Sequence, residues 1–141
     1  MSKKIRTGLC VCAGLLAAVV LAVYTLPKLR ATVFVKIYHT QIEASLVAYM
    51  GVPASDAVVL GYQSVNSWEG DHPMTEFILM SYGSTYYGCY YSPDDVPLAF
   101  QNTAAALAQT GTDRWEWRAE GDNHGATVKI LPCWYYFEAS F

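Results

Sequence analysis

The sequence is poor in charge, and its first quarter lacks acidic residues. Charged residues make up 15% of the 141 positions, against about 25% in an average soluble protein. Residues 1–36 contain six basic residues and no acid, whereas residues 37–141 contain three bases and all twelve acids. An acidic domain repels a phosphate backbone, so we predict no nucleic-acid partner.

Recognisable catalytic and cofactor motifs are also missing. The chain has no GxSxG, HExxH, P-loop or dinucleotide signature. His72 and His124 lie beside acids in turn-like segments and match no metal-ligand spacing. Asp94 and Asp95 lack the alternating acids of a calcium loop. We therefore predict no metal, no cofactor and no catalytic residue.

Apolar residues, by contrast, fill 53% of the chain, and aromatics 14%, which excludes a disordered protein. Between Arg6 and Lys28 lie 21 residues without charge, and about 20 apolar residues in a helix span a bilayer. We predict a membrane anchor over residues 1–30, with basic flanks and a transmembrane helix at Gly8–Tyr24. A cleaved signal peptide is the alternative, although no good small-residue cleavage site precedes Lys28.

The basic residues around the apolar stretch bear on its orientation. Three of them precede it and three follow it, but a short basic N-terminus before a first span usually stays inside. We therefore expect a signal-anchored, single-pass protein of the cell membrane. Residues 31–141 would form a small extracytoplasmic domain.

The pattern of that domain predicts an α+β fold. Ala31–Met50 has one apolar stripe at helical spacing, followed by Gly51 and Pro53 as stop signals. The stripe consists of Phe34, Tyr38, Ile42, Leu46 and Tyr49. The residues after Pro53 read mostly as strands joined by short turns, which predicts an antiparallel sheet of about five strands under the amphipathic helix.

The expected strands are defined by β-branched and aromatic residues between turn signals. They cover Asp56–Val65, Thr75–Tyr82, Thr85–Tyr91, Asp113–Glu120 and a last extended region, Ala126–Glu138, interrupted by Pro132. A polar turn is expected at Ser67–Pro73. The alanines of Leu98–Gln109 indicate a short inserted helix.

Four cysteines form two pairs in the sequence. Cys10 and Cys12 are expected to be small apolar residues of the membrane helix, with reversible acylation as the alternative. Cys89 and Cys133 lie in aromatic segments and are candidates for a disulfide outside the cytoplasm. Closing that loop would contribute about 4 kcal/mol. Two buried free thiols are the other possibility.

The aromatic residues gather in the C-terminal half and are the candidate binding residues. Tyr87 and Tyr91 share a face of one expected strand, Tyr135 lies in the last segment, and Trp115 and Trp117 alternate with charges. A bond between the two strand cysteines would bring the tyrosine faces together as a platform for a glycan, peptide or protein. Ordinary core and sheet packing is the alternative interpretation.

Three C-terminal segments carry a family resemblance. They are YYSPDDVPLAFQ (Tyr90–Gln101), the GDN turn (Gly121–Asn123) and WYYFEASF (Trp134–Phe141). Together they resemble small membrane-anchored proteins of Gram-positive bacteria that have no assigned function. The resemblance implies a surface location and supplies no activity.

These observations lead to one functional hypothesis and two alternatives. We expect a membrane-anchored extracytoplasmic binding module whose partners are the lipid bilayer and another membrane or envelope protein. The first alternative is a membrane-tethered hydrolase that uses Asp and His side chains from the loops. The second is a toxin-immunity or inhibitor module whose acidic face matches a basic target.

Overall fold

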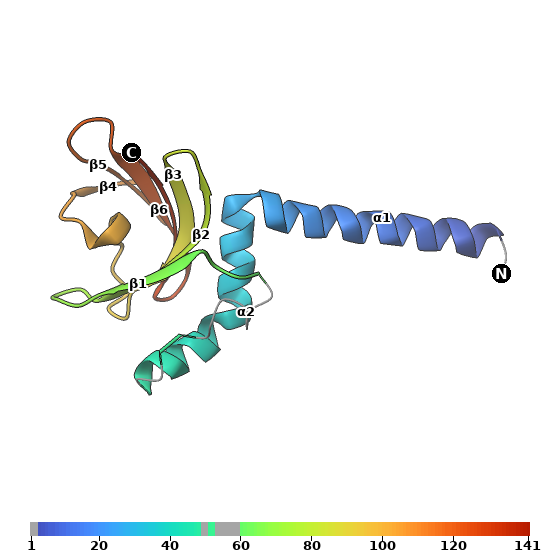
Figure 1. Ribbon diagram of the computed structural model, residues 1–141, viewed down its shortest axis with the longest axis horizontal. Helices are drawn as coiled ribbons and strands as arrows, with labels where there is room; N and C mark the ends of the chain where they lie inside the picture. Colours follow the sequence, from blue (N-terminus) through green and yellow to red (C-terminus); the bar gives the residue numbers. More distant parts are fainter. Residues whose placement is uncertain (1–2, 49–50, 53–59) are drawn as a thin grey trace.

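The structure is a computed structural model that describes residues 3–48, 51–52 and 60–141. Two helices, α1 (Lys3–Thr25) and α2 (Pro27–Val47), precede a seven-stranded antiparallel sheet. Figure 1 shows that α2 lies along one face of the sheet, whereas α1 projects away from the rest of the molecule. The α+β class predicted from the sequence is confirmed.

The joint between the helices follows from its local sequence. Leu26 is extended, with φ −98° and ψ 108°, because the residue before a proline avoids the helical region. Pro27 then occupies the first turn of α2, where its missing N–H costs nothing. The predicted helix at Ala31–Met50 is thus present but begins earlier. Tyr49, Met50 and Pro53 lie outside the described residues.

The sheet contains two more strands than predicted. Its strands are β1 (Ser64–Trp68), β2 (Met74–Tyr82), β3 (Thr85–Tyr91), β4 (Leu107–Gly111), β5 (Arg114–Arg118), β6 (His124–Leu131) and β7 (Trp134–Ser140). They lie in the order β1-β2-β3-β7-β6-β5-β4, every pair antiparallel. Two meanders therefore meet at the central β3–β7 pair.

Two expectations about the strands need correction. The extended region Ala126–Glu138 is two strands, because Pro132 and Cys133 form the turn between β6 and β7. β1 includes Ser67 and Trp68, where a polar turn was predicted. Residues 56–59 of the first predicted strand lie outside the described part of the chain.

The expected helix at Leu98–Gln109 is wrong. The segment holds a short 3-10 turn, η2 (Phe100–Asn102), and then enters β4. Tertiary contacts outweigh the helical preference of its alanines, because the Tyr90 hydroxyl accepts from Leu98 N at 2.8 Å and donates to Leu98 O at 3.1 Å. Phe100 also stacks on Tyr86, with ring centroids 5.7 Å apart.

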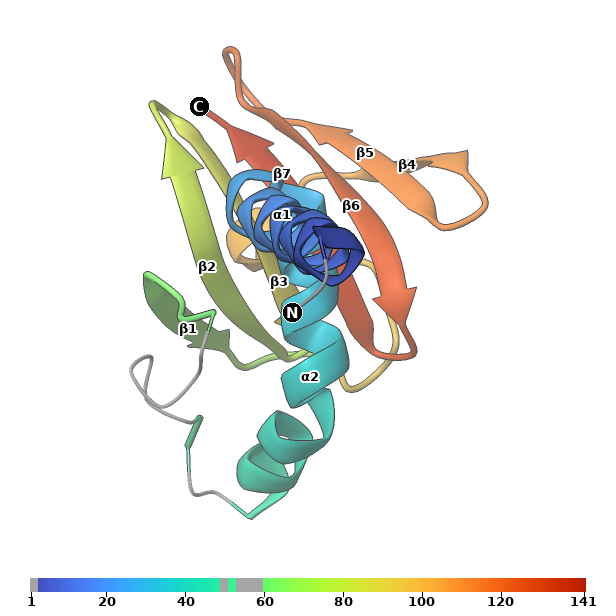
Figure 2. The ribbon, with the colours of Figure 1, turned by 90° about the vertical axis from the view of Figure 1, so that its right-hand side faces the viewer.

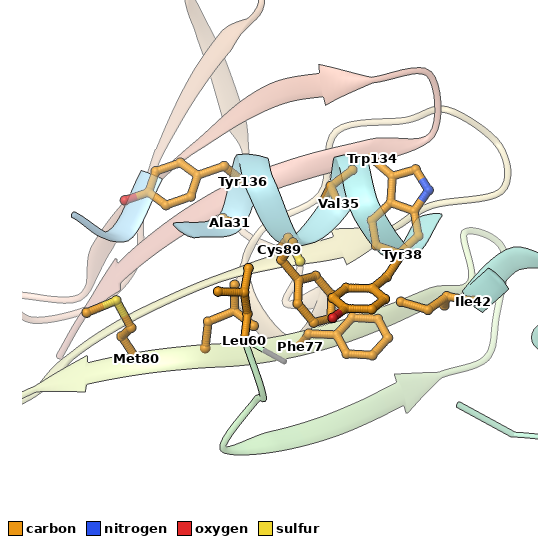
Figure 3. Packing of buried hydrophobic residues seen from close by; sticks show 12 residues of the cluster. Ala31, Val35, Tyr38, Ile42, Leu60, Phe77, Met80, Cys89, Trp134 and Tyr136 are labelled. Carbon is orange, nitrogen blue, oxygen red and sulfur yellow. The ribbon is translucent and has the colours of Figure 1, made fainter. Parts of the chain in front are cut away.

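Each face of the sheet has its own core. On the α2 face, Tyr38 and Ile42 of the predicted helix stripe pack against Phe77 and Trp134, as Figure 3 shows. Phe34 of the same stripe belongs to this cluster as well. On the opposite face, residues 96–105 of the β3–β4 connection cover a second cluster around Tyr90 and Phe137. We call these the helix face and the loop face. Successive side chains of β7 point alternately to the helix face and to the loop face, because side chains alternate along a strand.

Candidate functional site

Helix α1 exposes many large apolar side chains, unlike the surface helices of ordinary soluble proteins. Leu15 and Leu16 are 64% and 66% exposed, although consecutive residues point about 100° apart on a helix. Other exposed apolar residues of α1 are Val11, Val19, Val20 and Leu21. A surface helix of a soluble domain shows one apolar stripe against its core, and the exposed apolar residues on several sides of α1 differ from that pattern.

Judged by length and apolarity alone, no single helix in the described part of the chain qualifies as a membrane span. Cys10–Thr25 and Pro27–Val47 qualify as a pair, bent by 98° at their junction.

Arg30 ties this junction to the domain. Its Nη2 donates to the carbonyl of Leu60, at the entry to the sheet. Its guanidinium also lies over the ring of Tyr24, 5.6 Å from the centroid. One side chain therefore contacts α1, α2 and the segment before β1, so the direction of α1 is coupled to the domain.

A polar hollow opens on the helix face beside α2. Because α2 packs on β2, β3 and β7, the same face of β4–β6 stays uncovered. The hollow has a volume of about 510 Å³. Its charged and polar lining includes Thr110, Arg114, Glu116, Arg118, His124, Glu138 and Ser140. The edge strand β4 forms one rim, and its Leu-Ala-Gln-Thr-Gly sequence carries no charge that would prevent a partner strand from pairing.

The charges in the hollow are mixed and partly unpaired. Arg114 donates through Nε and Nη2 to Glu116 Oε1, at 3.1 and 3.0 Å. Arg118 has no ion-pair partner among the described residues. Burial, and then the charge of Glu138, raise the pKa of Tyr136, whose hydroxyl contacts Glu138 Oε2 at 3.4 Å. The arrangement suits a polar partner carrying both signs of charge.

The histidines do not form a catalytic pair with the carboxylates of the hollow. His124 Nδ1 lies 2.6 Å from the carbonyl of Asp122. His72 contacts Asp94 at 3.3 Å, with both side chains about half exposed. Within the described residues, no group of three or more His, Cys, Asp or Glu could hold a metal ion.

The five aromatic candidates lie on both faces of the sheet. Tyr87 and Tyr91 are half-buried on the helix face, next to Tyr82 and Trp134 respectively. The other three candidates, Tyr135, Trp115 and Trp117, lie on the loop face. Tyr135 is buried and stacked on Tyr90 at 5.1 Å, and Trp117 is only 4% exposed. The five residues therefore do not form one continuous platform.

The predicted disulfide is absent, because all four cysteines are free. Cys89 is opposite Tyr136 in the β3–β7 pair, three residues along β7 from Cys133. Three residues of strand correspond to about 10 Å, beyond the roughly 7 Å between Cα atoms that a disulfide tolerates. Cys89 is buried in the helix-face core, while Cys133 lies in the β6–β7 turn with its thiol 3.7 Å from the carbonyl of Pro93.

Two acids have roles that the sequence did not indicate. Glu76 is fully buried on the loop face, and burial raises its pKa to about 7 despite hydrogen bonds from Gln101 N and Asn66. Asp95 is bound by Lys129 Nζ at 2.6 Å, Cys133 N at 2.7 Å and Tyr135 Oη at 2.9 Å. The sequence signal for Glu76 was its position as a charged residue within an otherwise largely apolar strand, which could have indicated a buried acid. Asp95 was visible only as a turn residue.

Comparison of this chain with protein-family models, with curated proteins and with solved structures finds no match. Function must therefore be argued from the geometry alone.

Proposed function

We propose that this protein is a membrane-anchored interaction module whose helix α1 is embedded in a bilayer. The observation that carries the proposal is the exposed apolar surface around α1. The uncharged part of the helix, residues 7–25, has 19 residues and is therefore about 28 Å long, close to the roughly 30 Å of a hydrocarbon core. No charged residue lies between Arg6 and Lys28, so the uncharged part of the helix begins before Cys10.

The domain is the part that would meet a partner, outside the cytoplasm. Its polar hollow and the uncharged edge of β4 lie side by side. Together they offer charged side chains and strand backbone that pairs with no other described strand. A protein partner can use both, by pairing a strand with β4 and placing polar groups in the hollow. The partner we propose is a neighbouring membrane or envelope protein.

Membrane insertion and orientation can be tested on the intact protein in cells. We expect the full chain to resist extraction by alkaline carbonate and to float with membranes. For orientation, Cys10, Cys12 and Cys133 are replaced by serine, and Glu120→Cys places a reporter on the exposed turn after β5. A membrane-impermeant maleimide should label this reporter in intact cells. Buried Cys89 should stay unreactive.

Recovery of the intact chain in the aqueous fraction without detergent would overturn the anchor. Labelling of Glu120→Cys only after lysis would place the domain in the cytoplasm instead. The two results are distinguishable. Recovery in the aqueous fraction shows that α1 is not inserted, whereas labelling only after lysis shows that α1 is inserted in the opposite direction.

Binding through the hollow needs a matched pair of variants. Arg118→Glu reverses an unpaired charge in the hollow, whereas Glu120→Lys changes an exposed charge two residues away that does not line this hollow. We expect proteins crosslinked to the wild type in membranes to be lost with Arg118→Glu and kept with Glu120→Lys. Equal recovery with both variants would exclude the hollow as the binding site.

A further inference from the structure

Helix α2 also carries an outward stripe of apolar and polar residues, on the side opposite to its core stripe. The core stripe, including Ala31, Phe34, Tyr38 and Ile42, faces the sheet. The outward stripe recurs at helical spacing and consists of Leu29, Lys36, Ile37, Thr40, Ala44 and Val47. Ile37 is 59% exposed and Val47 is 76% exposed, so the largest apolar side chains of this stripe contact little of the domain.

The direction of this stripe is set by the bend between the helices. α1 leaves α2 at 98°, on the side away from the sheet. In Figure 2, α1 points toward the viewer and α2 lies in front of the sheet, so the outward stripe and α1 share one side of the molecule. A bilayer that contains α1 along its normal would therefore have α2 parallel to its surface.

We propose that α2 lies in the membrane interface, with its outward stripe in contact with lipid and the sheet stacked on its other side. The proposal rests on the proposed function, since α1 must be in the bilayer. Leu29, Ile37 and Val47 would enter the boundary between headgroups and acyl chains, as apolar faces of interfacial helices do. Exposed Leu26 and Leu29 would then connect the apolar surface of α1 with the outward stripe of α2.

The charges near this stripe fit a lipid surface with anionic headgroups. Lys28 and Lys36 are exposed, and neither has an ion-pair partner in the described part of the chain. Their long side chains can reach phosphates while their stems lie on apolar surface. Basic residues near an anionic membrane surface strengthen binding to it.

The packing of α2 also explains why it cannot cross the membrane together with α1. Phe34, Val35 and Ile42 are buried against the sheet, and a sheet with exposed edges cannot enter the hydrocarbon. Glu43 additionally accepts a hydrogen bond from Trp134 Nε1 at 2.7 Å. α2 is therefore held on the domain and can present only its outward side to lipid.

Depth-dependent fluorescence quenching tests this arrangement in the full-length protein. Cys10, Cys12 and Cys133 are replaced by serine, and an environment-sensitive fluorophore is attached to Ile37→Cys, Val47→Cys or the distal control Glu120→Cys. The proteins are reconstituted into vesicles of phosphatidylcholine and phosphatidylglycerol. We expect lipid-borne nitroxide to quench Ile37→Cys and Val47→Cys, and aqueous iodide to quench them several-fold less than Glu120→Cys.

The outcomes separate this inference from the proposed function. If the protein floats with the vesicles but iodide quenches all three positions equally, α1 is anchored and the inference about α2 is wrong. Protection from both nitroxide and iodide would mean that a protein, such as a second copy, covers the stripe. That result would also contradict the contact between α2 and lipid. Failure to float would refute the anchor itself.

A charge variant tests the role of the lysine. Lys36→Glu is expected to increase iodide access at Ile37→Cys in vesicles with phosphatidylglycerol, and to change it much less in vesicles of phosphatidylcholine alone. An equal change in iodide access in both kinds of vesicle would show that Lys36 does not interact with anionic headgroups.

Discussion

Glu76 is a carboxylic acid enclosed on the loop face of β2. Its Oε2 accepts a hydrogen bond from Gln101 N at 3.1 Å, but its Oε1 is buried without a hydrogen-bond partner in the described residues. Burial is the main cause of the rise in its pKa from 4.5 to about 7, because leaving water disfavours the charged form. The residue therefore couples the stability of the domain to pH.

The sign of that coupling follows from the direction of the shift. Between pH 4.5 and 7 the folded state retains a proton that the unfolded state has released, so stability should fall as pH rises. We expect Glu76→Gln to abolish most of this slope and to be more stable than the wild type above pH 7, by roughly 3 kcal/mol at most. Urea unfolding in detergent at acidic, neutral and alkaline pH measures this dependence of the unfolding free energy on pH. Exposed Glu120→Gln is the control, and an unchanged slope in Glu76→Gln would contradict the prediction.

Gly88 is required by the close approach of β2 and β7 to β3. A Cβ added there would overlap the carbonyl oxygen of Phe77 and lie 2.8 Å from Phe137 Cε1. Since backbone would have to move, we expect Gly88→Ala to lower the free energy of unfolding by about 1–3 kcal/mol. Gly111→Ala, whose Cβ would meet only Arg114 Cβ at 3.4 Å, is the matched control. Similar unfolding midpoints for the two variants would show that the sheet adjusts freely.

At the scale of elements, the sequence predicted best where local pattern and tertiary environment agree. Thr75–Tyr82 and Thr85–Tyr91 correspond to β2 and β3, and the alternation in Asp113–Glu120 correctly places Trp115 and Trp117 on one face of β5. The segment Leu98–Gln109 failed because its conformation depends on Tyr90, a partner on another strand. The polar hollow was also invisible, since its residues come from four strands whose order a single sequence does not reveal.

The β3–β4 connection is held to the β6–β7 turn by Asp95. Hydrogen bonding from Lys129 lowers the pKa of Asp95, so this contribution to stability should be lost as pH falls below its ordinary value of 3.8. Asp95 also has a φ of 55°, a left-handed conformation that asparagine tolerates better than alanine.

We therefore expect Asp95→Asn to destabilise the domain by about 1–2 kcal/mol and Asp95→Ala by more. Thermal unfolding at neutral pH measures both. Asp94→Asn changes the neighbouring residue, which has only an exposed contact with His72, and should have little effect. An equal effect of Asp94→Asn and Asp95→Asn would argue against the proposed role of Asp95.

At the scale of the whole molecule, the projecting helix and the domain are structurally separable. Val23 is the described α1 residue that packs against the helix-face core, whereas α2 supplies five buried residues. α1 therefore adds little to the core and exposes much apolar surface.

We expect residues 27–141 to fold without α1. Near-ultraviolet circular dichroism should show the fixed aromatic environments of the full chain in detergent, and the truncated protein should remain in solution without detergent. The full-length chain should require detergent under the same conditions. Loss of the near-ultraviolet signal on truncation would mean that α1 is part of the folding unit.

The sequence by itself determined the apolar leading helix, the amphipathic second helix and the alternation of the central strands, because each depends on side-chain periodicity within one segment. Only the tertiary structure decided that the cysteines stay apart, that the aromatics divide between two faces and that a polar hollow opens beside α2. These features depend on which strands are neighbours and in what register. The 98° turn at Pro27 likewise needed both the local extended residue and the contacts of Arg30 with Tyr24 and Leu60.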